Sequence, residues 1–277
     1  MGRRKFFLPT QNKRQTVVPD DVKMNNFDEI KKESFECPNC AKIIYPPYPP
    51  NLGQLIKSLK DQETQHDKEK QEEYKSYVAQ CKEKGETPLP FLTEPLEIDI
   101  NQKKNICRVH KIELKYKPMA KEKGYPEHID FNLIDKRIMS FQGELKSIID
   151  KSLPSSFLDN ALKRFEKLGT KARNTDEVLK TFEAYLPGYY GNKGSDKMMD
   201  TLNRLFLQTD YMNNEKAAPL TVVEFLQQVL VPECGIRLIR EDKQNKITLE
   251  EAKSIMSESQ EYGSTVYFSV DVDNKKE

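Results

Sequence analysis

Residues 219–242 read PLTVVEFLQQVLVPECGIRLIRED, and this stretch decides the fold class. Thr221 and Glu224 form a capping-box pair, which satisfies backbone amides at the start of a helix. The apolar residues that follow recur at helical spacing, and they are Phe225, Leu226, Val229 and Leu230. Pro232 suits the first position of a following helix, where its missing N–H costs nothing. The stretch therefore predicts two consecutive helices, each with one buried face.

The same combination of cap and apolar stripe recurs elsewhere in the C-terminal half. Ser156 and Asp159 precede one stripe, and Thr248 and Glu251 precede another. Each capping pair supplies partners to helix amides that would otherwise be unpaired. Because caps and stripes agree repeatedly, the sequence predicts a mainly α fold, with a helical bundle over residues 124–277.

Two short segments show the alternation of apolar and polar residues that is typical of strands. Residues 95–100 read PLEIDI and follow a proline-rich break. After Gly263, apolar residues alternate with polar ones, at Val266, Phe268, Val270 and Val272. The sequence therefore predicts a short strand at each place, the second of them near the C-terminus.

Composition excludes several classes of protein. Among 277 residues, 45 Lys and Arg nearly balance 44 Asp and Glu, so the net charge of +1 argues neither for nor against nucleic acid. No apolar run reaches the 18 or so residues of a membrane span, and the N-terminus lacks the apolar core of a secretory signal. Five cysteines without such a signal favour a reducing, intracellular compartment.

The chain divides into three predicted regions. Residues 1–34 form a polar N-terminal arm with five basic residues and no acid within positions 1–14. This arm fits a nuclear targeting or nucleic-acid-contacting tail, and it equally fits an ordinary solvated terminus. Residues 35–123 form a Cys/His region with a helical insertion, and residues 124–277 form the helical domain.

The insertion is predicted to be one long helix over residues 52–84. Apolar residues recur at helical spacing at both ends, but the stretch from Lys60 to Glu73 is polar and lacks the apolar seam of a coiled coil. A solvated helix that contacts a core only at its ends is therefore expected. The prolines at 46, 47, 49 and 50 indicate a rigid, extended connector before it, in preference to a ligand for a proline-binding domain.

One set of residues has specific chemistry. Cys37 and Cys40 form C-x-x-C, and Cys107 and His110 form C-x-x-H at the same spacing. Two such pairs commonly supply the four ligands of a tetrahedral zinc ion. Four protein ligands would make a closed structural site, without an open position for a catalytic water.

Other interpretations of these residues stay open. The C-x-x-C pair could be redox-active, although no βαβ pattern surrounds it, and the second pair could be a core cysteine and a surface histidine. Cys81 and His66 are potential substitute ligands, but each stands alone in the sequence. His128 and Cys234 fit packing or loop roles better.

Residues 188–195, GYYGNKGS, form a weaker candidate site. Its glycines and Lys193 could hold an anion at a helix N-terminus, or contact a partner. The candidate contact residues are Gly188, Tyr189, Tyr190, Gly191, Lys193 and Gly194. The order differs from a P-loop, and a turn whose tyrosines pack on the core explains the same residues. With three histidines and no nucleophile–base set, the sequence predicts no enzymatic activity.

Several segments together resemble one family. They are FECPNCAKIIYPPYPPNLGQLI, CRVHKIEL, GYPEHIDFNLIDKRI, SFLDNALKRFEKLGTKAR, LPGYYGNKG, PLTVVEFLQQVLVPECGIRLIRED and AKSIMSESQEYG. In this order, from Phe35 to Tyr267, they are similar to the domain of the fungal restriction of telomere capping protein 4 and its relatives.

The resemblance implies a mainly fungal protein of nucleus and cytoplasm that influences telomere capping, and it implies no known enzymatic activity. It also implies metal ligands at Cys37, Cys40, Cys107 and His110. Two hypotheses follow. The first is a zinc-stapled, non-enzymatic interaction module with a nuclear protein partner and no membrane contact. The alternative is a protein that binds nucleic acid directly through its basic arm and the GYYGNKG turn.

Overall fold

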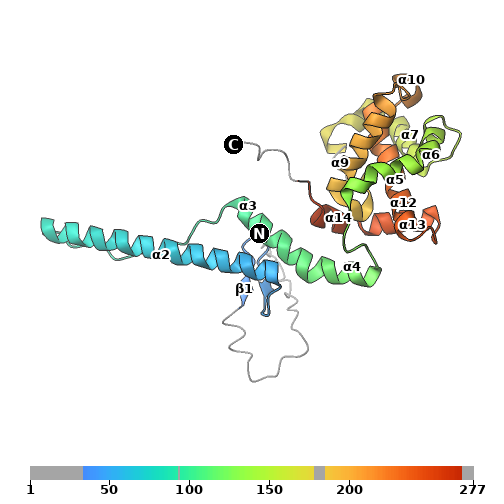
Figure 1. Ribbon diagram of the computed structural model, residues 1–277. Helices are drawn as coiled ribbons and strands as arrows, with labels where there is room; N and C mark the ends of the chain where they lie inside the picture. The colour runs from blue at the N-terminus through green and yellow to red at the C-terminus, as the bar shows by residue number, and fades with distance from the viewer. Residues whose placement is uncertain (1–33, 93, 178–184, 270–277) are drawn as a thin grey trace, which may run out of the picture. The chain divides into compact units, whose positions relative to one another are not determined.

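The computed structural model describes residues 34–92, 94–177 and 185–269 (Figure 1). The chain divides into two compact units, Met1–Glu113 and Leu114–Glu277. Almost all of the predicted basic arm, residues 1–33, lies outside the described residues. No helix in the described part combines the length and apolarity that a membrane crossing requires.

The first unit contains a small hairpin and two helices. These elements are β1 (Phe35–Glu36), β2 (Ile43–Ile44), α2 (Pro50–Lys84) and α3 (Ile100–Lys111), and the π-helical turn η2 (Ile112–Tyr116) spans the boundary between the units. The hairpin, the start of α2 and the middle of α3 enclose a small core of Phe35, Ile44, Leu52, Ile56, Leu59 and Ile106. The segment predicted as the strand PLEIDI is instead a loop that leads into α3. Asp99 accepts hydrogen bonds from the first amides of that helix, so a helix start replaces the strand.

Helix α2 confirms the predicted long helix. Its buried residues are Leu52, Ile56 and Leu59 at the start and Cys81 at the end. The stretch between them is polar, and it has no apolar stripe to pack against another element. The first turn contains Pro50, which has no amide hydrogen to leave unpaired, and Gly85 ends the helix in the left-handed conformation (φ +71°).

The second unit is a helical bundle, as predicted. Its elements are α4 (Lys117–Lys123), η3 (Phe131–Leu133), α5 (Ile134–Ser140), α6 (Gln142–Ile149), α7 (Ser156–Leu168), η4 (Gly169–Arg173), η6 (Gly188–Tyr190), α9 (Gly191–Leu202), η7 (Asn203–Leu207), α10 (Asn214–Ala217), α11 (Val222–Phe225), η8 (Leu226–Leu230), α12 (Val231–Asp242), α13 (Leu249–Glu258) and α14 (Gln260–Val266). The two capping boxes expected at Thr221 and Thr248 are both present. The cap of α7 is Ser155 in place of the predicted Ser156.

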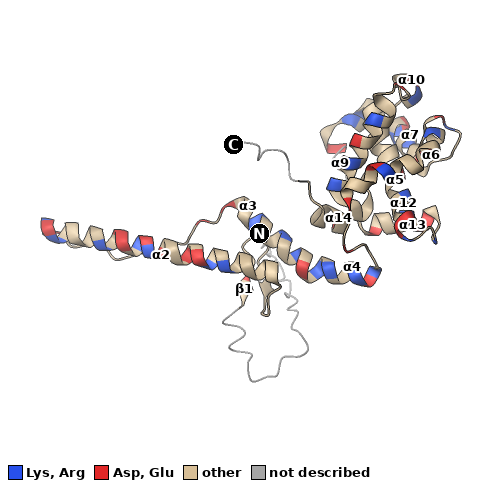
Figure 2. Ribbon diagram, in the orientation of Figure 1, with Lys and Arg blue, Asp and Glu red and all other residues tan. Residues whose placement is uncertain are grey.

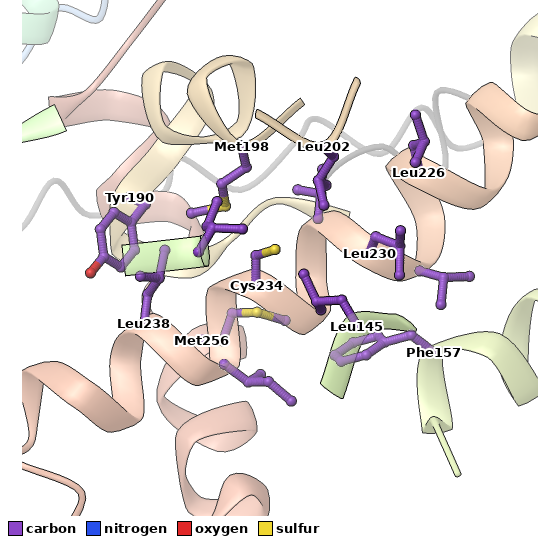
Figure 3. Close-up of a cluster of buried hydrophobic side chains, with 14 of the residues drawn as sticks. Leu145, Phe157, Tyr190, Met198, Leu202, Leu226, Leu230, Cys234, Leu238 and Met256 are labelled. Carbon is purple, nitrogen blue, oxygen red and sulfur yellow. The ribbon is translucent and has the colours of Figure 1, made fainter. Parts of the chain in front are cut away.

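The core of this bundle surrounds α12, which is buried along most of its length (Figure 3). Cys234 lies at its centre with no exposed surface, next to apolar residues of several other helices. Helices α5 and α6 also supply fully buried residues, including Ile134 and Leu145. Burial of this apolar surface is the main source of stability for the unit.

The predicted C-terminal strand is wrong within the described residues. Val266 ends helix α14, and Tyr267 to Ser269 continue without strand structure. Val270 and Val272 lie outside the described residues. Tertiary contacts decide the structure here instead, because Tyr267 packs its ring against Phe131 and Tyr262. The strands that are described, β1 and β2, lie near the N-terminus.

Candidate functional site

A candidate metal-binding knuckle is formed by the hairpin at the start of the first unit. Strands β1 and β2 pair antiparallel, with Phe35 opposite Ile44, and the CPNC turn lies between them. The Cys37 amide donates to the Lys42 carbonyl (3.0 Å), and the Ala41 amide donates to the Cys37 carbonyl (2.9 Å). Ala41 adopts a left-handed conformation (φ +55°), which closes the turn. The turn thereby brings the thiols of Cys37 and Cys40 to one side.

Helix α3 supplies the other two ligands. Cys107 and His110 are three residues apart, so they share one face of the helix. Both are buried, as is Ile106 beside them, which belongs to the small core. The apolar packing of α3 therefore holds the thiol and the imidazole toward the hairpin.

The four side chains converge. The ligand atoms of Cys37, Cys40, Cys107 and His110 all lie within 4.8 Å of one another. Cys40 Sγ is 3.4 Å from His110 Nε2. Tetrahedral zinc with bonds of about 2.3 Å to sulfur and 2.0 Å to nitrogen requires ligand separations of about 3.5–3.8 Å. The structure therefore brings together all four predicted ligands in a candidate metal site of three thiols and one imidazole.

The pKa values at the site show which groups are neutral and which thiol ionises most readily. Burial, together with the charges of Lys42 and Lys111, lowers the pKa of His110 to about 4, so its imidazole is neutral at pH 7. Burial raises the pKa of the Cys37 thiol to about 11. Burial also opposes the thiolate of Cys40, but hydrogen bonds from the Lys42 backbone and neighbouring thiols outweigh it and lower its pKa. A coordinated divalent cation would deprotonate all three thiols.

The other cysteines and histidines lie outside this cluster. Cys81 is buried near the end of α2, and Cys234 is enclosed in the core of the second unit. His128 is exposed, and His66 lies on α2 beside Asp67. Burial raises the pKa of Cys234 far above its ordinary value, so this thiol is a packing residue.

The GYYGNKG segment is packed into the second unit. Tyr189 and Tyr190 have no exposed surface, and Gly188, Gly191 and Gly194 are buried with them. Lys193 is exposed, and its ammonium group lies 4.7 Å from the centre of the Phe131 ring. The rings therefore offer no surface for a partner or for base stacking in this conformation. The turn that packs its tyrosines on the core is the interpretation that this geometry fits.

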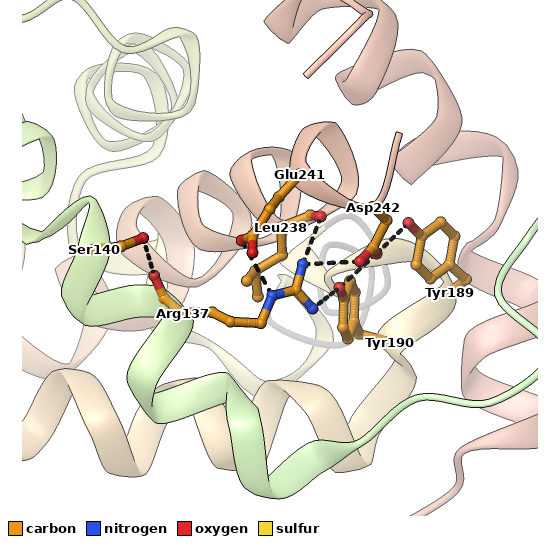
Figure 4. Close-up of polar contacts among 7 residues, drawn as sticks. All are labelled: Arg137, Ser140, Tyr189, Tyr190, Leu238, Glu241 and Asp242. Atoms are coloured by element: carbon orange, nitrogen blue, oxygen red, sulfur yellow. Dashed lines mark hydrogen bonds and ion pairs between the residues drawn. The ribbon is translucent and has the colours of Figure 1, made fainter. Parts of the chain in front are cut away.

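A partly buried polar network explains the two tyrosines (Figure 4). Both hydroxyls donate to Asp242 Oδ2, each at 2.6 Å. Arg137 donates to Asp242 Oδ1 (2.8 Å) and to the Tyr190 hydroxyl (2.9 Å), and it pairs with Glu241 as well. Burial and the negative charge of Asp242 raise the pKa values of both tyrosines. The network joins α5, η6 and α12.

The glycines of this segment allow two backbones to touch. A Cβ atom at Gly263 of α14 would lie 2.0 Å from the Gly188 carbonyl oxygen, and one at Gly191 would lie 2.1 Å from the Gly263 carbonyl oxygen. Only residues without a side chain permit this approach. The glycines therefore serve the packing of η6 against α14.

Sequence reasoning missed two groups of residues. Asp242 and Arg137 were not considered as interacting residues, although they form a half-buried ion pair. Nothing in their local sequence signals this, because the partners are 105 residues apart. Lys42 and Lys111 were also missed, although Lys42 follows the C-x-x-C pair closely and Lys111 follows His110.

Comparison with known proteins identifies one segment. Residues 150–267 match the family model of the RTC4-like domain. The resemblance seen in the sequence is therefore confirmed over this range, and the part before residue 150 stays a prediction. No curated protein and no solved structure matches the chain. The compact unit begins earlier than the matched range, because α5 and α6 supply core residues to it.

Proposed function

We propose that this chain, which carries an RTC4-like domain at residues 150–267, is a non-enzymatic interaction module whose N-terminal unit is stapled by a structural zinc ion. The observation that carries the proposal is the convergence of Cys37, Cys40, Cys107 and His110 within 4.8 Å. Three soft thiolates and one imidazole suit zinc in particular. The ion would join the hairpin to α3 and so close the long insertion between them.

A protein partner is supported by an apolar surface at the far end of α2. Tyr74 donates its hydroxyl to the Leu89 carbonyl (2.8 Å), and the Leu89 amide donates to the Tyr77 hydroxyl (3.3 Å). These bonds hold the loop that follows the helix. Two apolar residues of this loop, Leu89 and Leu92, are 70% and 80% exposed. Phe91 packs on Tyr74 beneath them, with ring centres 5.0 Å apart. An ordered apolar surface on a polar helix favours contact with a protein.

The cellular setting is part of the same proposal. The family resemblance places such proteins in nucleus and cytoplasm and links them to telomere capping, and we propose the same setting for this chain, with a nuclear protein as partner. No enzymatic step is assigned, because the proposed zinc ion would have all four positions filled by protein ligands.

Metal analysis of the purified protein tests the staple. We expect one zinc ion per chain by elemental analysis, and its loss in Cys107→Ser. Cys81→Ser is the matched control, since Cys81 is a buried cysteine outside the cluster, and it should keep the metal. A wild-type protein without stoichiometric zinc would overturn the staple.

Comparison of co-purifying proteins tests the interaction surface. Leu89→Ser with Leu92→Ser should remove specific partners that the wild-type chain retains. Val223→Ser, which changes a residue 56% exposed in the other unit, should retain them. Identical partners for all three proteins would exclude the loop as the contact surface.

The alternative hypothesis is direct binding of nucleic acid through the basic arm and the GYYGNKG turn. The turn no longer supports it, because both tyrosines are buried. Its basic arm lies almost entirely outside the described residues and stays a prediction. Deletion of residues 1–14 tests it, and unchanged binding to nucleic acid would count against the arm.

A further inference from the structure

Charge is distributed unevenly within the first unit (Figure 2). The segments that form the hairpin, the start of α2 and α3, residues 35–60 and 100–113, contain seven Lys and Arg but two Asp and Glu. The rest of α2 and the residues that follow it, 61–86, contain five Lys and Arg against eight Asp and Glu. Although the net charge of the whole chain is +1, the hairpin, the start of α2 and α3 are therefore strongly basic, and the rest of α2 is acidic. Such a local excess of positive charge attracts polyanions.

The basic residues of α3 lie on one face. Lys104, Arg108 and Lys111 are spaced at i, i+4 and i+7, which places them in a stripe along the helix. The stripe is about 10 Å long, from a rise of about 1.5 Å per residue. Ile106, Cys107 and His110 are buried on other sides of the helix, whereas Lys104 and Lys111 are exposed and Arg108 is half-buried.

Lys42 of the knuckle lies near the same site. Lys42 lies two residues after Cys40 and Lys111 directly follows His110, and Cys40 Sγ is 3.4 Å from His110 Nε2, so both lysines lie next to the candidate ligands. Lys42, Lys104 and Lys111 are exposed, and no hydrogen bond or ion pair of their side chains occurs among residues 34–92, 94–177 and 185–269. Because these three ammonium groups have no partner among the described residues, they remain available to bind a ligand.

We infer that this surface, comprising Lys42, Lys104, Arg108 and Lys111 and here called the basic stripe, binds the phosphate backbone of nucleic acid. Its members are all cationic, and exposed apolar residues flank it at Ile43 (36% exposed) and Ile100 (61% exposed). Clustered Lys and Arg side chains are typical of contacts to the phosphate backbone, which carry little sequence information. The stripe is separate from the protein contact at Leu89, but its geometry rests on the proposed metal staple.

Fluorescence anisotropy with labelled single-stranded and double-stranded oligonucleotides tests this inference. The full-length chain with its metal is titrated at several salt concentrations, with polyglutamate as a competing polyanion. We expect binding that weakens with rising salt and resists polyglutamate. Contacts to three or four phosphates give a slope of log affinity against log salt of about −2 to −4. The two oligonucleotides distinguish single strands from duplexes as the preferred ligand.

The matched variants differ only in where charge is removed. Lys42→Gln with Lys104→Gln and Lys111→Gln should weaken binding by about tenfold or more and reduce the slope by about two to three. Lys68→Gln with Lys75→Gln and Lys82→Gln removes the same charge from α2 and should leave binding within about twofold of wild type. Circular dichroism and zinc content establish that both variants remain folded and loaded.

Two outcomes would overturn the inference. Equal binding by the two triple variants would show that the basic stripe is not the contact surface. Complete displacement by polyglutamate at matched charge would assign the stripe to acidic proteins in place of nucleic acid. Because zinc content is measured in the same samples, loss of the metal staple would be recognised separately from failure of the basic stripe.

Discussion

The two units of this chain are each stabilised internally in a different way. Six buried apolar residues form the core of the first unit, and four side chains with metal-ligand chemistry lie beside it. The second unit has a continuous apolar core around α12, a buried Arg–Asp–Tyr network and a direct backbone contact between η6 and α14. A small core rarely stabilises a fold alone, so we expect the first unit, unlike the second, to depend on the proposed zinc staple.

Removal of the proposed zinc ion should reveal the largest difference in stability between the two units. In small domains structural zinc contributes on the order of 10 kcal/mol to folding. Chelation, or Cys37→Ser, should therefore abolish protection from hydrogen exchange in β1, β2 and α3. Amides of α12 should keep their protection, because their stability comes from apolar burial. Retained protection of α3 after complete zinc removal would show that the apolar core alone stabilises the first unit.

The backbone contact of the second unit predicts the next largest effect. Gly263→Ala places a methyl group 2.0 Å from the Gly188 carbonyl oxygen, so η6 and α14 must move apart. We expect a loss of about 3 kcal/mol or more in the free energy of unfolding, measured by chemical denaturation. Gly143→Ala is the control, because its methyl group would meet no atom within 4 Å, and it should stabilise α6 by about 0.5–1 kcal/mol. Equal stability of the two variants would refute the close contact.

The buried network predicts a smaller loss. Asp242→Asn removes the charge that Arg137 pairs with and weakens an acceptor shared by two tyrosine hydroxyls. The expected cost is about 2–3 kcal/mol by denaturation. Asp200→Asn, on the exposed side of α9, should change stability by no more than about 0.5 kcal/mol. If both substitutions cost the same, the network contributes nothing specific.

The smallest effect concerns pH. Hydrogen bonds from Arg173 and from the Thr221 backbone lower the pKa of Glu224. A lowered folded-state pKa stabilises the protein above the unfolded value of about 4.3, and this stability is lost as the pH falls through the folded value. Glu224→Gln should therefore cost about 1 kcal/mol at pH 7, and this cost should shrink as the pH falls below the unfolded value. A cost that stays constant in denaturation curves from pH 7 down to strongly acidic pH would contradict the assignment.

The fold was predictable where its signals are local. The capping boxes at Thr221 and Thr248 and the long helix after Pro50 follow from neighbouring residues, because caps and helical periodicity act within one or two turns. The predicted strands failed because an alternating pattern does not specify what it packs against. Asp99 starts a helix where PLEIDI suggested a strand, and Tyr267 packs against Phe131 where a second strand was expected.

The candidate site divides in the same way. Spacing alone identified the candidate ligands Cys37, Cys40, Cys107 and His110. Tetrahedral zinc sites are commonly built from two pairs of ligands at short spacing, and such pairs can be recognised in a sequence. Their convergence across 70 residues, between Cys40 and His110, depends on the packing of α3 against the hairpin. Likewise, the sequence showed a motif in GYYGNKG, but only the tertiary structure assigned it to the core. Burial and backbone contact depend on partners far away in the chain, and no local pattern specifies them.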